Sequence, residues 1–247
     1  MNKPFSFLTI GIVSLLLFAT SCSSPEKEPG KKDTETPVPP APPKIDPFYK
    51  TADQFVKKFN KKGQLSEKTK NEAFALYNEH KWAALEALFN RPTDTLNGGW
   101  PPGNGGFNIV ANVSLTKGLE YDRYSGDFGF TEDSLFPILG GQFTSPVIGG
   151  VHYKFGQRAL NKSKDKYDFF YDIEVLKELP FKAQNADVIP WFKQPGLGKQ
   201  TMWEITKDTV TGYSYTWNQL AEMGYIKVTI LSSPSGKYDK YVGKVIE

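Results

Sequence analysis

The sequence predicts an α+β fold in which a helical segment precedes a compact domain built mostly from short strands. The first observation is that apolar residues recur at helical spacing between residues 51 and 90. The second is a change at Asn97, after which glycines cluster and short β-prone runs alternate with turns. The third is a late helical signature that begins at Thr216. We therefore expect a helical segment over residues 47–96 and one folded domain over residues 97–247.

The helical segment carries recognisable start and stop signals. Thr51-Ala-Asp-Gln54 fits a capping box, and Gly63 fits the end of that first helix. Ser66 can cap a second helix. A third apolar run ends at Pro92 and is carried by Trp82, Leu85, Leu88 and Phe89. We expect these helices to pack on a neighbour, with His80 at the surface or in packing rather than in catalysis.

The later domain has the pattern of strands separated by turns, with one convincing helix. Thr216-Trp-Asn-Gln219 fits a capping box, and Gly224 supplies the stop. No internal repeat is apparent. The clearest β-prone runs are Phe107–Val113, Phe169–Leu176 and Tyr225–Leu231.

The first residues are typical of an export signal. Lys3 gives a positive start, and the apolar run Phe5–Phe18 is too short to span a bilayer. Small residues follow and lead to Cys22, which resembles the end of a bacterial lipobox, although Ala stands where Leu is commoner three residues earlier. We expect residues 1–21 to be a lipoprotein signal peptide and Cys22 to be lipidated. A plain secreted protein and a retained anchor are the alternatives.

The next stretch, residues 22–46, is rich in proline, charge and small polar residues. Such a composition forms no core, so we expect a disordered linker whose proline-rich half is stiff and extended. Acyl chains on Cys22 would hold the exported protein on a membrane, at the outer membrane or the cell surface.

Composition excludes several classes of function. The chain has 247 residues, enough for one sizeable core, and a net charge of +3 with acids and bases interspersed. Such a charge distribution gives no sign of a basic patch that would bind nucleic acid. One cysteine excludes a disulfide framework and a Cys-based zinc site. Two histidines, His80 and His152, supply a metal site poorly, and we expect no metal.

The stretch Pro190–Gln200, "PWFKQPGLGKQ", combines rigidity with unusual side chains. Two prolines and two glycines forbid a regular helix or a central strand. The same loop carries two large aromatics and two neutral amides. We expect it to let the backbone approach a ligand closely, with an aromatic wall at one end and an amide at the other.

Four separated pieces resemble the family of tuberculosis necrotizing toxin, the TNT domain, in order and approximate spacing. They are Trp100–Phe107 ("WPPGNGGF"), Tyr121–Tyr124 ("YDRY"), Gly141–Pro146 ("GQFTSP") followed by Arg158, and the loop Pro190–Gln200. The resemblance implies an α+β fold with a mixed, mainly antiparallel sheet and few helices. It also implies an NAD(P)+ glycohydrolase, which releases nicotinamide and leaves ADP-ribose, and a toxin-like role with an immunity protein as partner.

That chemistry suits the residue types in the four pieces. The leaving group is already a cationic pyridinium, so no strong base, metal or cofactor is required, and NAD+ or NADP+ is the substrate. The protein must hold the diphosphate, clamp the nicotinamide ring and position the ribose. Guanidinium groups form bidentate hydrogen bonds with phosphate oxygens. Aromatic faces can stack on the nicotinamide ring, and a neutral amide can hydrogen-bond the ribose or a water molecule.

The resemblance assigns roles position by position. Arg123 and Arg158 match the two family arginines and are expected to contact the diphosphate or ribose. Gln200 matches the closing Gln and is the expected catalytic amide, with Gln194 as second choice. Further substrate-binding candidates from the matched pieces are Tyr124, Phe143, Ser145, Trp191 and Phe192.

The sequence departs from the family at two places. Phe143 stands where the family has Tyr, so the hydroxyl is absent. A family His is missing from the run Tyr167–Ile173, and Tyr171 or Asp168 could replace it. Each departure leaves open a catalytically weak or inactive surface lipoprotein that only binds NAD or ADP-ribose.

Structural roles compete with each assignment. Arg123 could pair with Asp122 or Asp127, and Arg158 could sit in a structural ion pair. The loop aromatics could be hydrophobic staples, Phe143 could be core, and Gln200 could cap backbone groups. His152 is expected to be structural, and Glu174 to be a solvated strand residue rather than a nucleophile. A structural or adhesive surface lipoprotein is the third functional alternative.

Overall fold

The computed structural model describes residues 48–60, 63–92, 95–126 and 137–247. Lys44–Glu247 form one compact unit. The expected signal peptide, the linker, Cys22 and Asp127 lie outside the described residues. None of the helices within the described part is long and apolar enough to cross a membrane.

Three helices come first, and the N-caps predicted at Thr51 and Ser66 are present, although the Gln54 side chain accepts from the Lys50 backbone and does not complete a capping box with Thr51. They are α1 (Ala52–Val56), α2 (Glu67–Asn78) and α3 (Trp82–Phe89). The Thr51 hydroxyl accepts a hydrogen bond from the Gln54 backbone N–H, and the Ser66 hydroxyl accepts one from the Thr69 backbone N–H, at 3.2 Å each. The first helix ends at Val56, earlier than the glycine stop predicted for it. Short 3₁₀ turns elsewhere are Leu96–Gly99, Gly103–Gly105, Phe155–Arg158, Lys164–Lys166 and Asp239–Tyr241.

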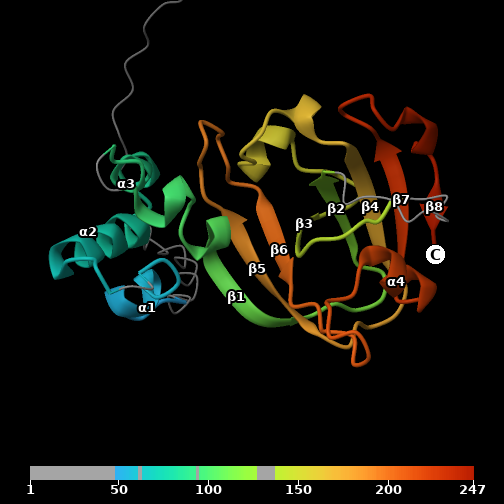
Figure 1. Ribbon diagram of the computed structural model, residues 1–247, viewed down its shortest axis with the longest axis horizontal. Helices are drawn as coiled ribbons and strands as arrows, with labels where there is room; N and C mark the ends of the chain where they lie inside the picture. The colour runs from blue at the N-terminus through green and yellow to red at the C-terminus, as the bar shows by residue number, and fades with distance from the viewer. Residues whose placement is uncertain (1–47, 61–62, 93–94, 127–136) are drawn as a thin grey trace, which may run out of the picture. The chain divides into compact units, whose positions relative to one another are not determined.

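The later domain is one eight-stranded sheet, which confirms the predicted α+β fold class. The strand order is β1-β5-β6-β3-β2-β4-β7-β8, and every pairing between the described strands is antiparallel (Figure 1). The strands are β1 (Gly106–Ser114), β2 (Glu120–Ser125), β3 (Phe143–Pro146), β4 (Phe169–Val175), β5 (Lys182–Val188), β6 (Lys199–Trp203), β7 (Ile226–Ser232) and β8 (Val245–Ile246).

The sheet has a weak joint between β2 and β3. These two strands pair only through Tyr121 with Pro146 and Asp122 with Ser145. Beyond that point Arg123 and Tyr124 pair with β4 alone. This weak joint therefore divides the sheet into two four-stranded halves. At the end of β2, the side chains have no β3 strand beside them.

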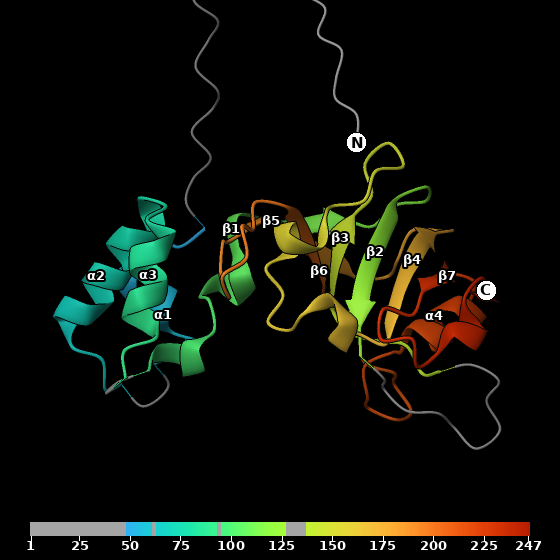
Figure 2. The ribbon, with the colours of Figure 1, turned by 90° about the horizontal axis from the view of Figure 1, so that it is seen from above.

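Helix α4 (Trp217–Glu222) covers the half of the sheet near β7, as Figures 1 and 2 both show. The capping box predicted at Thr216 is present: the Gln219 side chain accepts from the Thr216 backbone amide at 2.8 Å, and the Thr216 hydroxyl accepts from the Gln219 backbone amide at 3.2 Å. Trp217 lies edge-on to Trp203 at 4.6 Å between ring centroids, and both rings are fully buried. This aromatic pair belongs to the hydrophobic core beneath that half of the sheet.

The helices α1, α2 and α3 pack at the β1 and β5 end of the sheet (Figure 2). The Tyr77 hydroxyl donates to the Gly106 carbonyl at 2.9 Å, and Phe89 lies edge-on to Trp191 at 5.7 Å. The prediction that the helical segment packs on a neighbour is thus confirmed, and that neighbour includes the loop Pro190–Gln200.

Candidate functional site

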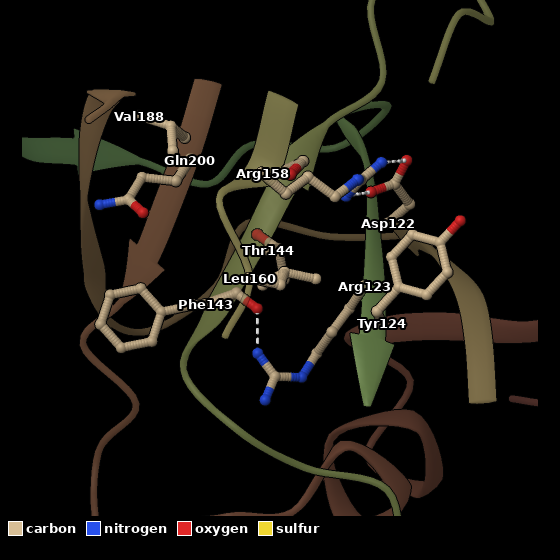
Figure 3. A pocket seen from close by; sticks show the side chains of 10 residues that line it. Asp122, Arg123, Tyr124, Phe143, Thr144, Arg158, Leu160, Val188 and Gln200 are labelled. Carbon is tan, nitrogen blue, oxygen red and sulfur yellow. Dashed lines mark hydrogen bonds and ion pairs between the residues drawn. The ribbon is translucent and has the colours of Figure 1, made fainter. Parts of the chain in front are cut away.

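A cavity of about 470 Å³ lies where β2 and β3 separate. It is lined from the end of β2, the start of β3, the 97–105 and 188–192 segments, and β6. A smaller cavity of about 60 Å³ adjoins it (Figure 3). The two share Arg123, Tyr124, Phe143, Arg158, Leu160, Val188 and Gln200. The three residues expected to act together, Arg123, Arg158 and Gln200, therefore do line one cavity.

The chemistry of the larger cavity is distinctive. Its described lining contains two guanidinium groups, four amide side chains and no carboxylate. Five aromatic side chains complete it, namely Trp100, Tyr124, Phe143, Tyr167 and Phe192. Its volume falls within the ~300–1,000 Å³ typical of small-molecule sites. Such a lining suits a ligand that is anionic, carries flat rings and offers hydroxyl groups.

Arg123 enters the cavity because β2 has lost its β3 partner at this position. Its Nη1 donates to the Phe143 carbonyl. Its Nε is buried without a hydrogen-bond partner in the described chain. The surface pair with Asp122 that the sequence offered as an alternative does not form, because Asp122 pairs with Arg158 instead.

Gly141 creates the space that Arg123 occupies. Its φ of +114° lies in the region that favours glycine, and a Cβ there would lie 2.5 Å from Arg123 Cζ. The "GQFTSP" piece therefore begins with glycine for a reason that involves the site directly.

Arg158 is held far more tightly than Arg123. Both of its Nη atoms donate to the Asp122 carboxylate, which is fully buried, and Nε and Nη2 also donate to the Tyr153 carbonyl at 3.2 and 2.9 Å. In Figure 3 this guanidinium points at Asp122, whereas that of Arg123 points away from the pair and toward Phe143. The predicted alternative of a structural ion pair is present, on the wall of the cavity.

Asp122 is the centre of a small charged group. Its Oδ2 also lies 2.7 Å from His152 Nδ1, and Asp172 Oδ1 lies 3.7 Å from the same nitrogen. One ligand atom from each of Asp122, His152 and Asp172 lies within 4.8 Å of the others, which is a metal-like spacing. Because Asp122 is already neutralised by Arg158, we assign this group to structure and to the positioning of Arg158.

Gln200 lies on β6 opposite Ala186 and is half-buried. Its Nε2 donates to the Asn104 carbonyl at 3.2 Å. Its Oε1 accepts no hydrogen bond from the described residues. A Cβ on Gly106 would lie 2.7 Å from Gln200 Nε2, so glycine at that position makes room for the amide. The arrangement fixes one end of the amide and leaves its oxygen as a free acceptor in the cavity.

The ring of Tyr124 forms the aromatic wall beside Arg158. It stacks on Phe170 at 4.3 Å between centroids, and the Arg158 guanidinium lies 5.3 Å from its centroid. Phe143 lines both cavities from the start of β3. Ser145 lines only the smaller cavity and is buried.

The structure corrects the roles expected for part of the Pro190–Gln200 loop. Trp191 lines neither cavity: it is 1% exposed, and its Nε1 donates to the Gly99 carbonyl at 2.8 Å. It is the hydrophobic staple that the sequence offered as an alternative. Gln194 also lies outside both cavities, whereas Phe192 lines the larger one. The cause is a sharp turn at Phe192 and Lys193, with φ values of +52° and +59°, that separates neighbouring side chains.

Neither residue proposed to replace the family histidine reaches the cavity. The Tyr171 hydroxyl is buried and donates to the Gly140 carbonyl at 3.3 Å. Burial raises the pKa of Tyr171, and the nearby Arg123 partly opposes this. Asp168 accepts from the Ser235 hydroxyl at 3.0 Å. Glu174 lies on β4, is partly exposed and forms an ion pair with Lys227 at 3.1 Å, which agrees with the expected solvated strand residue.

Sequence reasoning missed several lining residues, namely Asn97, Trp100, Asn104, Asn161 and Tyr167. Trp100 and Asn104 lie within the matched piece "WPPGNGGF", where an aromatic residue next to rigid prolines was the available signal. Asn161 and Tyr167 lie in no matched piece, and only the fold brings them to the site.

Comparisons with known proteins find similarity to solved structures. No family model matches the chain, and no curated protein matches it. A solved structure described as tuberculosis necrotizing toxin complexed with its immunity factor is similar, with a TM-score of 0.35 and 20% identity. The match covers 56% of this chain and 66% of that chain, just under two thirds. The similarity is weak, so the functional argument rests on the cavity.

Proposed function

We propose that this protein is an NAD(P)+ glycohydrolase, which cleaves the bond between ribose and nicotinamide. One observation carries the proposal: Arg123, Arg158 and Gln200 come from three separated motifs and line a single cavity of about 470 Å³. A dinucleotide has a doubly charged diphosphate, two flat heterocycles and ribose hydroxyls. The guanidinium groups, aromatic rings and amides of the cavity match these three features in turn.

The two arginines have different tasks in this proposal. The Arg123 guanidinium donates to the Phe143 carbonyl, and its Nε has no hydrogen-bond partner among the described residues. It is therefore the group that forks onto the diphosphate oxygens. Arg158 is bound to Asp122 and the Tyr153 carbonyl. It supports binding by its fixed position and by the shape that it gives to the wall beside Tyr124.

The reaction needs little from the protein besides position and charge. The bond from ribose C1′ to the pyridinium nitrogen breaks with its electron pair, so nicotinamide leaves as a neutral molecule. A water molecule adds to the oxocarbenium-like sugar and loses a proton, which gives ADP-ribose. The free Oε1 of Gln200 can accept a hydrogen bond from that water or from a ribose hydroxyl, while Asn104 holds Nε2.

A second candidate is a protein that binds NAD or ADP-ribose without turnover. Phe143 lines the cavity without the hydroxyl of the family tyrosine, and neither Tyr171 nor Asp168 takes the place of the missing histidine. These two observations favour the second candidate only if the free amide of Gln200 is not sufficient for catalysis.

One assay separates the candidates. The purified full-length protein is incubated with NAD+ and with NADP+, and nicotinamide and ADP-ribose are followed by chromatography, with calorimetry in parallel. Equal molar release of nicotinamide and ADP-ribose supports the glycohydrolase. Calorimetric binding of ADP-ribose without product formation supports the binding protein. Neither binding nor turnover contradicts both and leaves a structural or adhesive protein.

We further propose that the enzyme is exported and held on a membrane through Cys22, in a toxin-like role that an immunity protein would restrain in the producing cell. Export would keep the enzyme away from the producer's own NAD. Cys22→Ser tests the anchor: labelled palmitate is expected in the wild-type protein and absent from the variant. Equal labelling of both proteins, or none in either, would contradict the anchor.

A further inference from the structure

The indole of Trp100 is the largest exposed apolar group on the cavity. Its side chain is 52% exposed and lines the larger cavity but not the smaller one. Ligand pockets are lined predominantly by apolar and aromatic side chains. Trp100 has no role in the chemistry proposed above, although it lies in the same cavity as Arg123 and Gln200.

The backbone on both sides of Trp100 is fixed. Asn97, Gly98 and Gly99 adopt left-handed conformations in succession, with φ values of +49°, +61° and +78°. The Asn97 Nδ2 donates to the Trp100 and Pro101 carbonyls at 3.1 and 3.3 Å. The Gly99 carbonyl accepts from the Trp191 indole. The turn and these hydrogen bonds thus fix the backbone that carries Trp100, so little backbone freedom is lost on binding.

Phe192 supports the same ring from the facing loop. The two rings meet edge to face, at 5.2 Å between centroids and 81° between planes. Phe192 also lines the cavity, and its φ of +52° is unusual for a bulky residue. Because Trp100 is 52% exposed despite this perpendicular contact, much of its surface stays available for a flat ring.

We propose that Trp100, braced by Phe192, forms the subsite for the adenine base of the dinucleotide. This inference rests on the proposed function. The two heterocycles of NAD lie at opposite ends of the molecule, with the diphosphate between them. The bond that breaks belongs in the enclosed part of the site, beside Gln200, where solvent is more limited. The half-exposed indole therefore meets the base that does not react, and stacking on any purine face stabilises binding.

Calorimetry with two ligands tests the adenine subsite. ADP-ribose carries the base, and ribose 5-phosphate lacks it. Stacking on an aromatic residue predicts that Trp100→Ala weakens ADP-ribose binding by about 5- to 150-fold. Binding of ribose 5-phosphate should be unchanged, and Trp100→Phe should keep most of the affinity. Tyr213→Ala is the matched control, because Tyr213 is 79% exposed and lies outside both cavities.

The outcomes separate this inference from the proposed function. Equal ADP-ribose affinity in Trp100→Ala and wild-type protein would overturn the adenine subsite alone, and so would an equal loss for both ligands. Wild-type protein that binds no ADP-ribose and hydrolyses no NAD+ would overturn the proposed function, and the subsite with it. Because Trp100 is half exposed, the alanine variant should keep its thermal midpoint, which calorimetric unfolding checks.

Discussion

At the scale of single residues, the position of the Arg123 side chain depends on Gly141. Gly141 has a positive φ, and the space that its Cβ would fill is taken by the Arg123 guanidinium. The Arg123 Nε is in turn buried without a hydrogen-bond partner among the described residues. An unpaired buried donor is unfavourable in the free protein, and an anion in the cavity would relieve that cost.

Gly141→Ala should therefore lower both stability and activity. We expect a loss of about 1–3 kcal/mol in the free energy of unfolding from the left-handed backbone. We also expect weaker NAD+ binding, because the guanidinium must move. Gly149→Ala is the control: its φ is +58°, and its Cβ would meet open space. Denaturant unfolding and steady-state kinetics check both variants, and a Gly141→Ala protein with wild-type KM would contradict this role.

Trp191 is another side chain whose position decides its role. Its indole donates to the Gly99 carbonyl, so Trp191→Phe should destabilise the protein by about 1–2 kcal/mol and leave kcat nearly unchanged. Trp217→Phe is the control, since Trp217 Nε1 is buried without a partner in the described chain and no hydrogen bond is lost. A large fall in kcat for Trp191→Phe, at unchanged stability, would restore Trp191 as a wall of the substrate site.

Among the strands, β2 and β4 carry acidic residues directly opposite one another. Glu120 faces Glu174, and Asp122 faces Asp172. Like charges in facing positions are unfavourable. Arg158 compensates Asp122, and Lys227 compensates Glu174. Within the described residues, the one ion pair of Asp172 is the long contact with His152, at 3.7 Å.

The pKa of Asp172 is accordingly raised. Burial is the main cause, the negative charges of Asp122 and Glu120 add to it, and His152 and Arg158 oppose it. The folded state therefore holds its proton to higher pH than the unfolded state, so this group's contribution to stability falls as pH rises from the ordinary value through the raised one.

Asp172→Asn should raise the melting temperature at pH 7, because it removes a charge that the folded state disfavours. The gain should shrink as pH is lowered through the raised pKa, where the wild-type carboxyl is also neutral. Glu174→Gln is the control, and it should bring no gain because it removes an acid with a cationic partner. Thermal melts across pH check both variants. A lower melting temperature for Asp172→Asn at pH 7 would show that its charge is favourable.

For the chain as a whole, local chemistry made the fold class predictable. The caps at Thr51, Ser66 and Thr216 and the alternating runs of β4 and β7 act over a few residues, so their outcome is visible in the sequence. Strand order is different, because it depends on pairings between distant segments. The weak joint between β2 and β3, which opens the cavity, has no local signal.

The candidate site was predictable in part for the same reason. Motif matching named Arg123, Arg158 and Gln200, and the fold brings them to one cavity. It did not separate Trp191 from Phe192, because no glycine marks the turn at Phe192 and Lys193 that sends the two rings to different places. Asp122 as the partner of Arg158 also needed the fold, since the two residues lie on separate elements.

The initial rate of nicotinamide release by Gln200→Ala tests the central claim most directly. The full-length variant is compared with wild-type protein at saturating NAD+, and with Gln142→Ala, which removes an exposed glutamine outside both cavities. If the Gln200 amide orients the reacting groups, its loss should lower kcat by about 10²–10³-fold, with Gln142→Ala unchanged. Wild-type turnover in Gln200→Ala would contradict the account.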